Sequence, residues 1–181
     1  YNIEGSAAIC NSVGQLLFYS KGAYIYDKNN NPMSRAGYGY TLNWDSILSG
    51  DPSSCQGVLI SRFACDTNKY YVFTTDGQSA NSIGFVGPKG KWDGLHYTVV
   101  NMNLNGGLGD IDVTYLSSSP GYIAGANKIA LIDSTNEKIT AVPHANGVDY
   151  WVVAQRRNKS LISFLVDCNG IHTTPVISVS Y

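Results

Sequence analysis

The chain has 181 residues, of which 44% are apolar and 14% charged, and its formal net charge is -1. This length can bury the core of one domain or of part of a larger one. The balanced charge excludes the basic surface that phosphate contacts require, so we expect no nucleic-acid partner. No apolar run is long enough to span a membrane. The chain begins at Tyr1 without an apolar leader, and we expect a mature product or a fragment.

The residue types favour an all-β protein. Glycine occurs 19 times and tyrosine 13 times, while glutamate stands only at Glu4 and Glu137. β-Branched, aromatic and turn-forming residues abound and strong helix formers are scarce. Short apolar runs flanked by Gly, Asn, Asp, Ser or Pro predict strands, in chain order at residues 7–10, 15–19, 24–27, 57–63, 70–75, 95–102, 111–116, 139–142, 150–153, 161–166 and 176–179. One short turn of helix is predicted around residues 43–48.

These runs repeat as three units of about four short strands each. The units cover about residues 6–34, 56–116 and 137–179, with insertions at about 34–54, 76–94 and 117–136. In this layout Leu17, Tyr71 and Trp151 take equivalent places. A repeated unit of four antiparallel strands is typical of a propeller blade. We therefore expect residues 1–181 to form a partial β-propeller, and a β-sandwich that contains three hairpins is the alternative.

Three stretches resemble a known family of proteins. They are Asn11–Tyr19, the run Leu95–Asp110 with its Asn-Leu-Asn-Gly-Gly-Leu-Gly-Asp end, and His144–Val153. They are similar to the N-terminal propeller region of large Bacteroidetes surface proteins, which leave the cell by the type IX secretion system and carry a gliding-motility-associated C-terminal sorting domain. The resemblance implies a secreted or cell-surface location outside the outer membrane and a non-catalytic binding or adhesion scaffold. Because propellers close with about 4–8 blades, we expect the remainder of the same polypeptide, or a partner chain, to complete this one.

The residues themselves carry no catalytic, cofactor or metal motif. His96, His144 and His172 are each isolated in sequence, which indicates structural roles rather than metal ligation. No serine stands in a Gly-x-Ser-x-Gly elbow. The stretch Asp27–Asn31 spaces its oxygens as calcium loops do but lacks the glycine and the distal glutamate, so it favours a plain turn. We predict no enzyme and no cofactor, with a glycan hydrolase that uses two propeller carboxylates as the alternative.

The four cysteines allow three pairings. Cys55 and Cys65 flank a predicted strand whose ends lie too far apart for a disulfide. Cys10 and Cys65 both follow the first strand of a unit, so a Cys10–Cys65 disulfide between adjacent blades is one prediction. Buried free thiols are the alternative.

We expect exposed aromatic residues of the insertions to bind a surface glycan or protein, because aromatic rings supply contact area at low entropic cost. The candidates are Tyr38, Tyr40, Trp44 and Trp92; packing into the scaffold's own core is the alternative for each. Ser46 and Ser134 follow aspartate, as do the O-glycosylation sites of Bacteroidetes, and are candidate glycan sites. A further alternative is a structural filament component, or a passenger whose propeller contacts the type IX export machinery.

Overall fold

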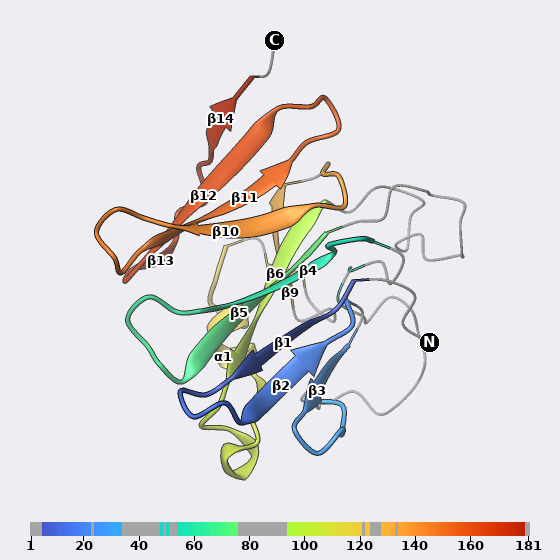
Figure 1. Ribbon diagram of the computed structural model, residues 1–181, viewed down its shortest axis with the longest axis vertical. Coiled ribbons are helices and arrows are strands. Elements are labelled where there is room, and N and C mark those ends of the chain that lie inside the picture. The colour runs from blue at the N-terminus through green and yellow to red at the C-terminus, as the bar shows by residue number, and fades with distance from the viewer. Residues whose placement is uncertain are drawn as a thin grey trace.

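The computed structural model describes residues 5–22, 24–33, 48, 50, 54–75, 94–120, 122–123, 128–132 and 134–179. They form an all-β fold of three antiparallel sheets (Figure 1), which confirms the predicted fold class at that level. The first sheet consists of β1 (Ala7–Cys10), β2 (Leu16–Ser20) and β3 (Ile25–Asp27). The second consists of β4 (Val58–Arg62), β5 (Lys69–Thr75), β6 (Leu95–Asn101), β7 (Asp110–Ile111), β8 (Tyr122–Ile123) and β9 (Lys128–Ile132). The third consists of β10 (Ile139–Pro143), β11 (Tyr150–Gln155), β12 (Leu161–Asp167), β13 (Gly170–Ile171) and β14 (Val176–Ser178).

Asparagine and aspartate side chains close the hairpins. Asn11 Oδ1 accepts the backbone N–H groups of Val13 and Gln15 at 3.1 and 2.9 Å, and Asp66 Oδ1 accepts that of Asn68 at 2.9 Å. Such side chains replace the missing partners of turn amides and favour tight turns over helix. Each of these strands therefore ends where the alternation of apolar residues stops and an asparagine or aspartate begins a turn.

One predicted strand is wrong. Residues 111–116 were expected to be extended, but after β7 they enter the short helix α1 (Val113–Ser117). Asp112 caps this helix, since its Oδ1 accepts the N–H of Tyr115 at 3.0 Å. Before it, the 3-10 helix η2 (Asn105–Gly107) shapes the loop after β6. The predicted helix at 43–48 lies outside the described residues apart from Leu48, which is buried.

The first strands of the three sheets lie side by side. β4 contacts β1 on one side and β10 on the other, and Figure 1 shows the sheets fanning out from these strands. Just before the strands, Gln56 and Lys138 form a parallel bridge, and Gly5 N–H donates to the Ser54 carbonyl at 2.9 Å. A side chain on Gly5 would collide with that carbonyl oxygen. The three sheets are thus tied together where their first strands begin.

The second sheet lies between the other two and forms the centre of the core. Six of the seven residues of β5, and six of the seven of β6, are buried, so both faces of these strands are covered. Phe18 of β2 meets Tyr70 of β5 with ring centroids 5.4 Å apart, which places Phe18 on the face toward the second sheet. Leu17, the next residue, points to the opposite face, so the predicted equivalence of Leu17 with Tyr71 is wrong by one residue.

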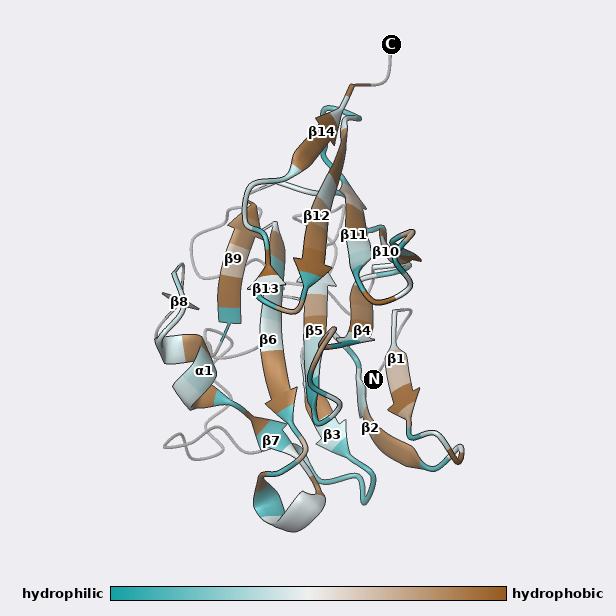
Figure 2. Ribbon diagram, turned by 90° about the vertical axis from the view of Figure 1, so that its left-hand side faces the viewer, coloured by the Kyte–Doolittle hydropathy of each residue, from teal (hydrophilic) through white to brown (hydrophobic). Residues whose placement is uncertain are grey.

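In the third sheet, buried residues alternate along the strands with half-buried or exposed ones. The pattern of β12 is exposed or half-buried at Leu161, Ser163 and Leu165 and buried at Ile162, Phe164 and Val166. In Figure 2, β12 and β14 of the third sheet and β9 of the second sheet carry much of the hydrophobic colour. Residues 128–132, expected in an insertion, form β9 and pair with β6. Among the described residues no helix is long and apolar enough to cross a bilayer.

Candidate functional site

The four predicted ligand-binding aromatics, Tyr38, Tyr40, Trp44 and Trp92, lie outside the described residues, as does Ser46. Ser134 is half-buried between β9 and β10 and precedes Thr135, which is fully buried. Its glycosylation stays a prediction.

The structure pairs the cysteines differently from the prediction. Cys65, in the loop after β4, forms a disulfide with Cys168, in the turn after β12, with their Cα atoms 5.0 Å apart. The predicted Cys10–Cys65 disulfide is therefore wrong, and Cys10 is a free, exposed thiol. Cys55 is exposed beside the start of β4. The disulfide joins the second sheet to the third, rather than the first to the second.

The side chain of Tyr150 also links the second sheet to the third, and we call the contact between these two sheets the seam. The Tyr150 hydroxyl donates to the Arg62 carbonyl at 2.8 Å and lies 2.8 Å from Ser61 Oγ. Because a phenol has one proton, Ser61 is the donor in the second bond. Burial raises the pKa of Tyr150 to about 12, although the Ser61 hydrogen bond opposes the shift. This hydroxyl is a structural bridge and is protonated at neutral pH.

Aromatic rings fill the seam behind that bridge. Phe63 stacks on Tyr71 with centroids 3.9 Å apart and meets Tyr115 edge-on at 5.6 Å. Tyr71 also meets Tyr97 edge-on at 5.5 Å. Burial raises the pKa of Tyr71 and of Tyr97 above the ordinary tyrosine range. Tyr71 and Tyr97 belong to the core, and the half-buried Phe63 and Tyr115 pack against it.

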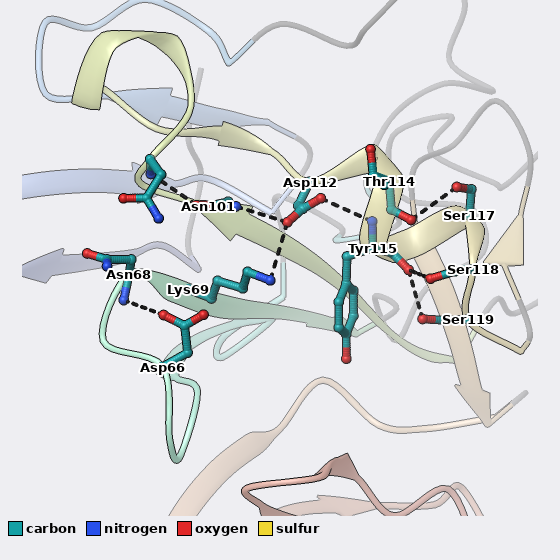
Figure 3. Close-up of polar contacts among 11 residues, drawn as sticks. Asp66, Asn68, Lys69, Asn101, Asp112, Thr114, Tyr115, Ser117, Ser118 and Ser119 are labelled. Carbon is teal, nitrogen blue, oxygen red and sulfur yellow. Dashed lines mark hydrogen bonds and ion pairs between the residues drawn. The ribbon is translucent and has the colours of Figure 1, made fainter.

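A polar cluster lies beside α1 (Figure 3). Asp112 Oδ2 accepts Asn101 Nδ2 at 3.1 Å and lies 3.7 Å from Lys69 Nζ. The Lys69 ammonium lies 5.5 Å from the centre of the Tyr115 ring. With its other oxygen capping α1, the Asp112 carboxylate has protein partners for both oxygens. The cluster anchors α1 to β5 and β6.

The candidate metal-binding residues have protein partners. Asp27 Oδ1 accepts the N–H groups of Asn29 and Asn31 at 2.8 and 2.9 Å, the hydrogen bonds of a plain turn. His172 Nε2 lies 2.8 Å from Asp167 Oδ2, and this contact lowers the pKa of Asp167. His96 is buried in β6, and Asn146 N–H donates to His144 Nδ1 at 3.3 Å. Within the described part of the chain, no group of three His, Cys, Asp or Glu residues could hold a metal ion.

A row of tyrosines lies on the outer side of the first sheet, and none of them was among the site residues predicted from the sequence. The rings of Tyr19 and Tyr26, on paired positions of β2 and β3, stack at 5.2 Å and 14°. Tyr24 lies beside Tyr26, and Lys21 Nζ lies 5.4 Å from the centre of the Tyr26 ring. We call Ala8, Tyr19, Tyr24 and Tyr26 the tyrosine face. The alternating tyrosines of residues 19–26 were the signal that could have indicated it.

A second outer surface is apolar. On the third sheet, Val142, Trp151 and Leu165 lie in one row across β10, β11 and β12, and Val153 and Val176 lie in the next row. Val142 is 48% exposed and Val176 is 54% exposed. We call Val142, Trp151, Val153, Leu161, Leu165 and Val176 the open face. Thr140 and Ser163 stand in the same row as Val153 and Val176, so the apolar residues of this face alternate with a few small polar ones. Exposed apolar residues gathered on one face are typical of a surface that another element covers.

Comparison of the chain with protein-family models, with curated proteins and with solved structures finds no match.

Proposed function

We propose that this chain is a partial β-propeller that serves as a non-catalytic binding or adhesion scaffold of a secreted or cell-surface protein. The observation that carries the proposal is the contact of β4 with both β1 and β10. In a propeller the first strand of each blade lines the axis, and the blades diverge from it. Side-by-side first strands with sheets fanning outward (Figure 1) support that arrangement.

The covered second sheet also supports a propeller over a sandwich. A sandwich has two sheets, each with one face toward the core and one toward solvent. Here β5 and β6 are buried on both faces because one sheet packs on either side. Successive units of the chain therefore stack as successive layers, as blades do.

The disulfide supports the proposed location. Disulfides persist in secreted and surface proteins and are rare in reducing compartments, and Cys65–Cys168 is an exposed disulfide between two loops. Export by the type IX system rests on the sequence resemblance, which also underlies the proposed Bacteroidetes origin.

The proposed binding chemistry is contact with a surface glycan or protein through aromatic side chains. The β-sheets form a rigid frame with short, hydrogen-bonded turns, and longer insertions carry Tyr38, Tyr40, Trp44 and Trp92. Rigid frames that present variable loops are a recurrent design for binding proteins. The Asp27 carboxylate caps a turn and the Asp112 carboxylate caps a helix, and these structural roles are in keeping with the non-catalytic proposal.

A glycan array probed with the 181-residue protein tests this function. We expect binding that is lost in Trp44→Ala or Trp92→Ala, with an unchanged circular dichroism spectrum, and retained in the carboxylate control Asp149→Asn. Binding that survives both tryptophan variants would contradict the assignment of these residues. Release of smaller sugars from bound glycans would overturn the non-catalytic proposal.

A further inference from the structure

We propose that the open face of the third sheet binds the tyrosine face of the first sheet in a second copy of this chain. The inference rests on the stacking of blade-like sheets in the proposed function. It adds the identity of the partner and the two surfaces that meet.

The contact between the second and third sheets shows what the open face lacks. Tyr71 and Phe73 of β5 lie on the same face as Ser61, which pairs with Tyr71 and whose hydroxyl contacts Tyr150 of the third sheet. Both rings are 0% exposed. Trp151 and Val153 of β11 are the first and third residues after Tyr150, as Tyr71 and Phe73 are after Tyr70. Trp151 pairs with Leu165 of β12 just as Tyr71 pairs with Val99 of β6.

The third sheet therefore repeats the apolar pattern of the second sheet, but no further sheet among the described residues covers it. Trp151, Val153 and Leu165 are only half-buried, and Leu161 is 45% exposed. A strand with apolar residues on both faces is stable when both faces are covered. The open face thus has the composition of a sheet with a neighbour on each side.

The tyrosine face supplies the matching half. The second and third sheets each turn one face back toward the preceding sheet: Tyr70 meets Phe18 of the first sheet, and Tyr150 bonds to Arg62 of the second. The first sheet has no preceding sheet among the described residues. Its backward face carries Tyr19 and Tyr26, both half-buried, and the exposed Ala8.

One molecule carries both the open face and the tyrosine face, but the two cannot meet within it because its own second sheet lies between them. A second copy can, by a head-to-tail contact of the heterologous kind. Two copies with three sheets each fall within the range of about 4–8 sheets that close a ring.

The charges of the two surfaces are compatible. Within β10, β11, β12 and β14, Asp167 is the one charged residue that alternation places on the open face, and it stands at the end of its strand. Lys21 lies over Tyr26 on the tyrosine face. The contact therefore joins a nearly uncharged surface with one acidic residue to an aromatic surface with one basic residue, without like-charge repulsion.

Sedimentation velocity of the wild-type protein over a range of micromolar concentrations is the test. We expect a dimer. Val176→Lys on the open face and Ala8→Lys on the tyrosine face each place an ammonium group in the contact, and each is expected to raise the dissociation constant more than about tenfold. Both residues are exposed, so the substitutions spare the fold. Val13→Lys, at a residue 76% exposed in the first hairpin, is the matched control and is expected to remain dimeric.

Mixing the two variants separates a head-to-tail contact from a symmetric one. The Val176→Lys protein keeps its tyrosine face and the Ala8→Lys protein keeps its open face, so an equimolar mixture is expected to regain dimers. A wild-type monomer would overturn the proposal. A dimer that survives Ala8→Lys would also overturn it, because the open face would then bind itself. The glycan array reads ligand binding independently of association, so failure of one proposal is distinguishable from failure of the other.

Discussion

The disulfide between Cys65 and Cys168 is expected to be one of the largest single contributions to the stability of the chain. It joins residues 103 apart in sequence and so removes the entropy of a very long loop from the unfolded chain. For a loop of about 100 residues this entropy corresponds to about 4.7 kcal/mol at 25 °C. Removal of a native disulfide typically lowers the free energy of unfolding by about 2–5 kcal/mol. We therefore expect the double variant Cys65→Ala/Cys168→Ala to lose about 2–5 kcal/mol in the free energy of unfolding.

Urea denaturation monitored by circular dichroism measures this loss. The wild-type protein with and without a reducing agent and the double variant form the series, and Cys10→Ala, which removes an exposed free thiol, is the matched control. Reduction should lower the midpoint of the wild type to that of the double variant and leave the double variant unchanged. Tryptic digestion without reduction should yield the peptide Phe63–Lys69 linked to Ser160–Tyr181.

Two results would contradict a stabilising Cys65–Cys168 disulfide. A double variant within about 0.5 kcal/mol of the wild type would show that the cross-link adds nothing to the contacts of Tyr150 and Phe63 at the same seam. A linked peptide that joins Cys65 to Cys10 would restore the pairing that the sequence predicted and contradict the structure.

Three further perturbations test separate parts of the fold. Asp112→Ala removes the cap of α1 and the partner of Asn101, so the free energy of unfolding should fall by about 0.5–2 kcal/mol, and by less in Asp112→Asn, in urea titrations; an equal loss in both variants would contradict the capping role. The pKa of Tyr150 is raised from 10.0 to about 12, so its contribution is complete below pH 10 and is lost as the pH rises toward 12. Tyr150→Phe should therefore flatten the alkaline fall of stability in titrations from pH 9 to 12, and an unchanged slope would argue against burial of this hydroxyl. Gly5→Ala drives a methyl group into the Ser54 carbonyl and should cost about 1–3 kcal/mol in thermal or urea unfolding, whereas Ser6→Ala, at an exposed residue, should cost almost nothing.

Strand positions could be predicted because their causes are local. β5 and β12 match the predicted runs 70–75 and 161–166 to within one residue at each end. Apolar alternation and flanking turn residues act within a few residues of the strand. The prediction at 111–116 was wrong because the Asp112 side chain offers a cap to the amide of Tyr115, and a five-residue helix then competes with an extended strand.

The candidate surfaces were less accessible to sequence reasoning. The pairing of β2 with β3 places Tyr19 and Tyr26 together on an outer face, and this placement was not predicted from the sequence. The same holds for Val142 and Leu165, which join one row only through β11. Which face of a strand is covered depends on the neighbouring sheet, and no local pattern encodes that neighbour.

The all-β class, the places of most strands and the turns between them follow from the amino-acid sequence, because propensity, alternation and turn chemistry are properties of short segments. Three features became visible only in the folded chain: which sheet covers which face, the pairing of Cys65 with Cys168 rather than with Cys10, and the orientation of Phe18 rather than Leu17 toward the second sheet. Those outcomes depend on contacts between residues far apart in the chain. A disulfide needs two Cα atoms about 4.4–6.8 Å apart, and it is the stacking of the third sheet on the second that brings these two cysteines within that distance.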